Sequence, residues 1–197
     1  ANALHFNKTQ WLEIFKMSAE TIREAHPEGK IIINMLPGDE PSINYYPVQH
    51  CKELIEYGVN FDVIGIELYG HSRLPGVPLD DKKHPMIDWV SKRLDAFSIF
   101  GKPVFLTEIA VSIASGEQSQ AEWLRNIYSV AFTKPYVKSI TWYFLTDDLF
   151  YPGAGILEEP DLKPRPAFNA LREFIATCTR LIGTSTSDSA SQEATQR

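Results

Sequence analysis

The chain has 197 residues, of which 44% are hydrophobic and 22% charged, so it has enough apolar material for one sizeable core and is not disordered as a whole. Its formal charge of -6 and the absence of any Lys/Arg cluster longer than two residues argue against a nucleic-acid-binding protein. No apolar run approaches the roughly 18 to 20 residues of a membrane span, so we expect no membrane partner.

Helical and strand-like stretches alternate along the chain. In the first helical stretch, Leu12, Phe15, Ala19 and Ile22 recur at intervals of three and four and form one apolar stripe. Helical spacing is found at residues 11–25, 48–57, 86–100, 120–132 and 166–176, and strand-like apolar runs at 31–33, 61–68, 104–106 and 137–144. Helix-ending residues separate each helix from the next strand, at Gly29, Gly58, Gly101 and Pro135.

This alternation predicts an α/β fold with a parallel sheet. A complete TIM (β/α)8 barrel takes about 250 residues, or about 31 for each unit, and the chain supplies four units after a leading helix. The simplest interpretation is half a barrel, made of its last four β/α units. A four-stranded doubly wound domain is the alternative, but it usually has a Gly-rich turn after its first strand, and residues 34–38 have no GxGxxG pattern.

The predicted half barrel spans residues 1–183. The segment 184–197 is rich in Ser, Thr and Gln and has almost no apolar residue, so its composition predicts a disordered polar tail. Half a barrel leaves strand edges and core surface uncovered. We therefore expect the N-terminal half of the same barrel as a partner.

Glu108 is the first candidate catalytic residue. It follows the apolar run Val104 to Leu106 and precedes the loop-prone segment 114–116. A charged residue at the C-terminal end of a barrel strand is typical of a catalytic group. A solvated loop residue or a helix-capping acid is the structural alternative.

Strand alternation predicts which side chains share a face with Glu108. If Glu108 points inward, Val104 and Leu106 point inward too. On the preceding strand the matching set contains Glu67 and Tyr69. The last strand would contribute Trp142, together with Ile140 and Phe144, and the first strand would contribute Asn34.

These residues would form a carbohydrate site. An aromatic face packs against the CH face of a sugar, while carboxylates and amides bind its hydroxyls. Each residue also has a structural alternative: Trp142 as a core residue, Tyr69 as a loop cap, and Glu67 as the partner of a Lys or Arg. Two adjacent carboxylates, Glu67 and Glu108, would raise the pKa of one of them unless a cation or hydrogen bond compensates.

Several motifs together resemble the C-terminal half of a family 10 glycoside hydrolase, the xylanase family. Residues 102–109, Lys-Pro-Val-Phe-Leu-Thr-Glu-Ile, resemble the strand-seven nucleophile motif, and residues 62–66, Asp-Val-Ile-Gly-Ile, are similar to the strand-six signature. Residues 140–142, Asp147, 155–157 and 163–168 resemble the strand-eight tryptophan, the following aspartate and the start of the last helix. The resemblance covers roughly residues 10 to 176.

The resemblance implies that Glu108 is the nucleophile and that Trp142 forms part of the wall beside the sugar. The acid/base glutamate would lie in an Asn-Glu sequence just before Ala1. The family's strand-six Gln-x-His becomes Glu67-Leu68-Tyr69, and the Tyr69 hydroxyl could donate the bond that the family's histidine gives to the nucleophile. His71 is a second possible donor. The family's strand-five Asn-Asp-Tyr becomes Asn34-Met35-Leu36, which leaves the sugar open.

The leading prediction is a retaining β-glycoside hydrolase acting on a β-linked, xylan-like or related polysaccharide or oligosaccharide. This chemistry needs no cofactor or metal, and the histidines and cysteines show no HxH, HExxH or CxxC spacing. A non-catalytic carbohydrate-binding or interaction barrel is the alternative from another class. A phosphate-binding metabolic barrel is disfavoured because the loop 145–155 is bulky and acidic. Secretion would suit a polysaccharide substrate, although no residue indicates a compartment.

Overall fold

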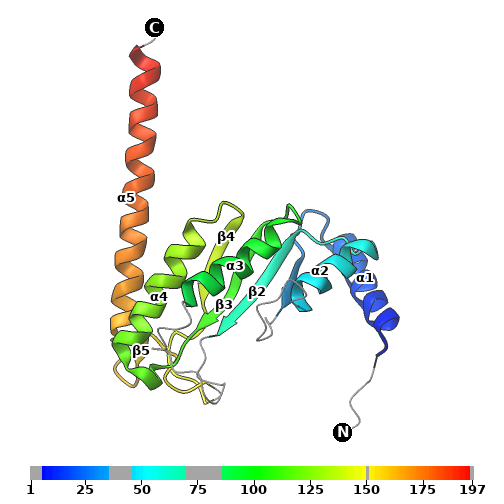
Figure 1. Cartoon of the computed structure of the whole chain (residues 1–197), viewed down its shortest axis with the longest axis horizontal. Coiled ribbons are helices and arrows are strands. Elements are labelled where there is room, and N and C mark those ends of the chain that lie inside the picture. Colours follow the sequence, from blue (N-terminus) through cyan, green and yellow to red (C-terminus); the bar gives the residue numbers. More distant parts are fainter. Residues whose placement is uncertain (1–5, 36–45, 70–85, 150, 196–197) are drawn as a thin grey trace. The chain divides into compact units, whose positions relative to one another are not determined.

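Four parallel strands form the sheet of this protein. A computed structural model describes residues 6–35, 46–69, 86–149 and 151–195, with 182–195 as backbone only. The strands are β1 (Ile32–Met35), β2 (Val63–Tyr69), β3 (Val104–Ala110) and β4 (Val137–Trp142). They lie side by side in chain order, β1-β2-β3-β4 (Figure 1). A barrel has this sequential order, whereas a doubly wound sheet reverses direction at a switch point. The sheet therefore favours part of a barrel over the doubly wound alternative.

The helices begin within three residues of the starts that the apolar spacing predicts, and the first four also end within two residues of the predicted ends. They are α1 (Lys8–Ala25), α2 (Tyr46–Glu56), α3 (Met86–Ser98), α4 (Glu117–Phe132) and α5 (Pro166–Thr195). The first helix begins three residues before the predicted start, because Asn7 and Gln10 form a capping box in which each side chain bonds the other's backbone N–H. Gly58 and Gly101 follow α2 and α3 with φ of 82° and 63°, a left-handed conformation that suits glycine.

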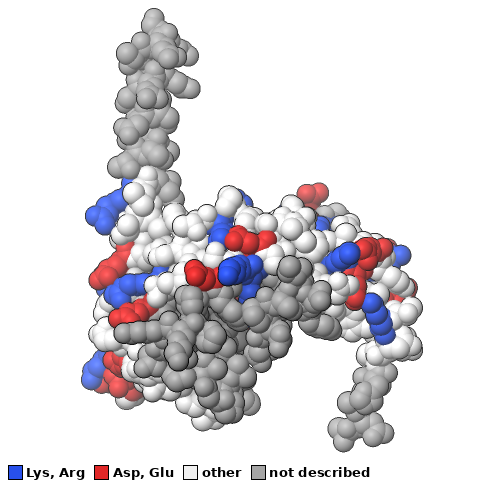
Figure 2. Space-filling model, viewed as in Figure 1, with Lys and Arg blue, Asp and Glu red and all other residues white. Residues whose placement is uncertain are grey.

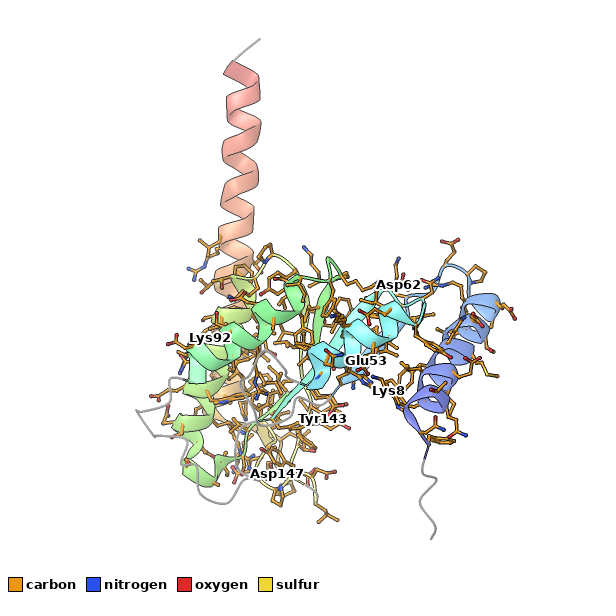
Figure 3. All side chains as sticks on the ribbon, turned by 45° about the vertical axis from the view of Figure 1, so that its right-hand side comes forward. Lys8, Glu53, Asp62, Lys92, Tyr143 and Asp147 are labelled. Atoms are coloured by element: carbon orange, nitrogen blue, oxygen red, sulfur yellow. The ribbon has the colours of Figure 1, made fainter. Side chains whose placement is uncertain are left out.

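The chain divides into two compact units. The first, which we call the sheet unit, comprises residues 1–70, 81–110 and 130–143. The second comprises residues 71–80, 111–129 and 144–197. Within the sheet unit, Lys8 of α1 points toward Glu53 of α2, and their Nζ and Oε1 atoms are 2.6 Å apart (Figure 3).

The two faces of the sheet differ in character. Apolar side chains of β2 and β3 pack against α3: Ile66, Leu68 and Leu106 line one pocket with Val90, Leu94 and Phe97. A Cβ built on Gly65 would lie within 3.1 Å of side-chain atoms of Ile32, Asn34 and Thr107, so these residues share the opposite face of the sheet. Asn34 bonds Glu67 on the same face. We call this face, which carries Ile32, Asn34, Gly65, Glu67 and Thr107, the polar face.

A β-bulge in β3 changes which residues share a face. Gly65 pairs with Phe105 and Ile66 with Leu106, but Glu67 pairs with Glu108, so Thr107 is the extra residue. The prediction that Val104 and Leu106 point the same way as Glu108 is therefore wrong. Leu106 packs under α3, and Val104, two residues earlier in the regular part of the strand, shares its face. The strand also continues to Ala110, so Glu108 lies within β3 and not where a loop begins.

The second unit is built around two buried polar side chains. Gln120 is fully buried, and its Nε2 donates to the carbonyls of Val111, Gly153 and Gly155 at 2.9, 3.1 and 3.3 Å. Arg165 is 6% exposed and bonds both carboxylate oxygens of Asp147, at 2.7 and 2.9 Å. A short 3-10 helix, η1 (Ile113–Ser115), and a two-stranded antiparallel ribbon, β5 (Leu157–Glu158) with β6 (Lys163–Pro164), complete this unit.

The last helix differs from the prediction of a disordered tail. It continues to Thr195, through most of the polar segment 184–197. That segment contains neither Gly nor Pro, so no residue in it interrupts the helix that begins at Pro166. Composition alone did not predict this continuation.

Candidate active site

Glu108 of β3 is held by Tyr69 of β2. The Tyr69 hydroxyl donates a hydrogen bond to Oε2 of Glu108, as the sequence suggested it could. Burial raises the pKa of Tyr69 far above its usual range, and the bond to Glu108 raises it further. The phenol therefore keeps its proton and remains a donor to the carboxylate at any ordinary pH.

A second set of bonds joins three strands on the polar face. Asn34 of β1 donates from Nδ2 to Oε1 of Glu67 on β2, at 2.7 Å, and accepts through Oδ1 from the hydroxyl of Thr107 on β3. Gly65 makes this arrangement possible, because a Cβ there would lie 2.7 Å from Oδ1 of Asn34. The amide thus fixes the Glu67 side chain at the same level of the sheet as Glu108, its register partner.

The two carboxylates lie close together on adjacent strands. Within the described ranges, neither Glu67 nor Glu108 forms an ion pair with Lys or Arg. Burial raises the pKa of Glu67, the negative charge of Glu108 raises it further, and the bond from Asn34 opposes both effects. The pKa of Glu67 is thus raised, with burial as the largest cause and the charge of Glu108 as the second.

The aromatic residue beside Tyr69 is Tyr143, the residue after β4. Their ring centroids are 6.4 Å apart and the rings meet edge to face, while Tyr143 remains 51% exposed. Strand alternation predicted the even-numbered residues of the last strand at the site, and Tyr143 was not among them. Its only sequence signal is its place in the aromatic run 142–144.

Trp142 is half-buried and pairs in register with Ile109, the residue after Glu108. This pairing places Trp142 at the level of the carboxylates, but on the face of Ile109, which also pairs with Leu68 of the apolar pocket, and not on the polar face. Its contact with sugar stays a prediction. His71, the second possible donor to Glu108, and Leu36 lie outside the described residues.

These groups form the mixture that carbohydrate chemistry uses. Two carboxyl groups, an amide and two phenols lie near the C-terminal ends of parallel strands, where barrel enzymes have their active sites. Among the residues that the structure describes, no three His, Cys, Asp or Glu side chains are grouped as metal ligands would be.

None of the helices in the described ranges is long and apolar enough to cross a membrane. Acidic and basic side chains are interspersed on the face seen in Figure 2, without a broad basic area.

Comparison with known proteins identifies the fold. Neither a protein-family model nor a curated protein matches the chain. Among solved structures, xylanase 10B from Thermotoga petrophila RKU-1, in complex with xylobiose, matches 90% of the chain with a TM-score of 0.64 at 22% identity. A psychrophilic glycoside hydrolase family 10 endo-beta-1,4-xylanase matches 81% with a TM-score of 0.64 at 19% identity. The β-glucuronidase of Bifidobacterium dentium, complexed with coumarin-3-O-glucuronide, matches 88% with a TM-score of 0.65 at 18% identity.

The chain has the fold of part of a glycoside hydrolase barrel. It spans about half the length of the xylanases, 57% and 50%, and 28% of the glucuronidase. The predicted TIM-barrel architecture and the resemblance to glycosidases are thus confirmed at the level of fold. Because xylanases and glucuronidases match about equally well, the fold by itself does not select a substrate.

Proposed function

We propose that the protein containing this chain is a retaining β-glycoside hydrolase in which Glu108 is the nucleophile. The observation that supports this most is the Glu108 carboxylate on the polar face, held by the Tyr69 hydroxyl within a glycosidase-like sheet. In this reaction Glu108 attacks the anomeric carbon, the glycosidic oxygen leaves with a proton from an acid, and water then releases the sugar from Glu108.

The remaining parts of the reaction are proposed for the full-length protein. Among the described strands, β1 pairs with β2 alone and β4 with β3 alone, which leaves an outer edge on each for further barrel strands. We infer that the N-terminal half of the barrel covers these edges and supplies the acid/base glutamate. Asn34, Glu67, Tyr69 and Trp142 bind the substrate, a β-linked polysaccharide or oligosaccharide.

Hydrolysis by a Glu108→Ala variant tests the proposal. The full-length protein and the variant are assayed on a panel of aryl β-glycosides and xylo-oligosaccharides. We expect kcat/KM to fall by about 10³-fold or more, which corresponds to roughly 4 kcal/mol of transition-state stabilisation. The control is Glu20→Ala, which removes an exposed glutamate of α1 and should leave the activity unchanged.

Chemical rescue identifies the role of Glu108 more closely. The alanine leaves room for azide on the side from which Glu108 attacks, so azide should restore turnover of an activated aryl β-glycoside and give the α-glycosyl azide. If the full-length protein hydrolyses none of these substrates but binds sugars, the non-catalytic binding barrel is the correct interpretation. If Glu108→Ala retains full activity, the assignment of the nucleophile is wrong.

A further inference from the structure

Glu67 and Glu108 form a carboxyl pair on adjacent strands. They are register partners, and neighbouring strands lie about 4.8 Å apart. Each carboxylate accepts one bond from a different neutral donor: Glu108 from the Tyr69 hydroxyl, and Glu67 from the Asn34 amide. In the described part of the chain, no Lys or Arg pairs with either carboxylate.

We propose that this carboxyl pair holds a single proton, that the proton resides on Glu67, and that Glu67 thereby presents an O–H donor to a substrate hydroxyl beside the ionised nucleophile Glu108. The inference rests on the proposed function, because the proton on Glu67 bonds the substrate of that reaction. It adds a second substrate-binding carboxyl group whose protonation state matters.

The donors around the pair decide which member carries the proton. Among the described residues, the titratable neighbours of the pair are Tyr69 and Tyr143, and a phenol carries no positive charge in either protonation state. Glu108 accepts its bond from a neutral phenol, and a bond from a neutral donor to an ionised carboxylate is charge-assisted. Burial and the charge of Glu108 both favour the protonated form of Glu67.

The remaining oxygen of Glu67 is available to a ligand. Asn34 occupies Oε1, and Oε2 forms no hydrogen bond with any residue that the structure describes. A hydroxyl of the sugar, next to the carbon that Glu108 attacks, can accept a bond from the proton on Oε2, and bonds of this kind strengthen in the transition state. If Glu67 loses its proton, the donor disappears and two negative charges occupy adjacent strands. Substrate binding should then weaken as the pH rises.

Carboxyl NMR tests the shared proton independently of activity. The full-length protein, labelled with ¹³C at the glutamate carboxyl carbons, is titrated beside Glu67→Gln and Glu108→Gln variants. We expect one carboxyl signal whose pKa lies above the ~4.3 of an ordinary glutamate. This signal should be absent from Glu67→Gln, and its pKa should move back toward ~4.3 in Glu108→Gln. A Glu67 signal that titrates at or below ~4.3, or one unaffected by Glu108→Gln, would overturn the proposal.

The pH dependence of kcat/KM tests the donor. Gln keeps an oxygen for the Asn34 amide and an N–H donor for the substrate, but it does not titrate. We expect the wild-type protein to lose kcat/KM by about tenfold or more above the pH at which the Glu67 signal titrates, and the kcat/KM that Glu67→Gln retains to show no such alkaline decline. Glu67→Leu, which lacks the donor, should be weak at every pH.

The outcomes separate this proposal from the proposed function. A wild-type protein without hydrolytic activity refutes the proposed function, and the NMR titration still decides whether the pair shares a proton. A folded Glu67→Gln variant that is inactive at every pH, or one with the wild-type alkaline decline, refutes the donor role while leaving Glu108 as nucleophile.

Discussion

A methyl group at Gly65 should disrupt the polar face of the sheet. A Cβ at this position would lie 2.7 Å from Oδ1 of Asn34, 2.9 Å from Cγ2 of Ile32 and 3.1 Å from Cγ2 of Thr107. Carbon atoms pack comfortably at about 3.5–4.0 Å, so all three neighbours must move. Asn34 has little freedom to do so, because Glu67 and Thr107 bond both ends of its amide.

The cost of Gly65→Ala follows from these contacts. Overpacking a tight site costs about 1–3 kcal/mol, and loss of one hydrogen bond of the Asn34 amide adds about 0.5–1.5 kcal/mol. We therefore expect the free energy of unfolding to fall by about 2–4 kcal/mol. Loss of the Asn34 bond also removes the one contact that lowers the pKa of Glu67, so that pKa should rise further.

Urea denaturation of the full-length protein measures the first effect and ¹³C carboxyl titration the second. The control is Gly58→Ala: no atom lies within 4 Å of its Cβ, so its cost of about 1–2 kcal/mol comes from the left-handed backbone alone and the Glu67 titration should not change. In an Asn34→Ala background, Gly65→Ala should cost less because the shortest contact is gone. If Gly65→Ala unfolds at the same urea concentration as wild type and Glu67 titrates as before, the packing argument is wrong.

Two further predictions concern parts of the molecule away from the carboxyl pair. Gln120→Glu replaces the amide that donates to three carbonyl oxygens with a group that repels these oxygens when it is ionised. It should lower the free energy of unfolding, measured by urea denaturation, by about 3 kcal/mol or more, whereas Gln120→Met should lower it less. His50 is buried against Trp11, with Glu53 and Lys8 as the charged neighbours, and burial lowers its pKa below the usual ~6.5. The imidazole then takes up a proton at a higher pH in the unfolded chain than in the folded one, so stability should fall as the pH drops below ~6.5. Thermal melts at pH 5 and 7 measure this loss. His50→Phe should reduce it, whereas His26→Gln, at an exposed position, should not.

The sequence predicted the elements of the fold better than the geometry of the site. Apolar spacing and the glycines after α2 and α3 located the helices and strands, since both signals are local. It was also predictable that Gly65, Glu67 and Tyr69 share a face, because side chains alternate regularly along β2. The capping box of Asn7 and Gln10, which sets the start of α1, is likewise a local feature.

Two features did not follow from composition or strand alternation. The continuation of α5 to Thr195 runs against a composition typical of disorder. The position of Tyr143 beside Tyr69 depends on register shifts between β3 and β4, and a bulge leaves no mark in a single sequence.

The bulge in β3 is what allows one strand to serve both faces of the sheet. In a regular strand, Glu108 would point the same way as Leu106, toward the apolar side chains under α3, where an ionised carboxylate without a partner is strongly disfavoured. The extra residue turns Thr107 and Glu108 together toward the polar face, where one bonds Asn34 and the other accepts from Tyr69. The same irregularity therefore protects the core from a charge and brings Glu108 beside Glu67, and bulges are known to redirect side chains in this way next to active sites.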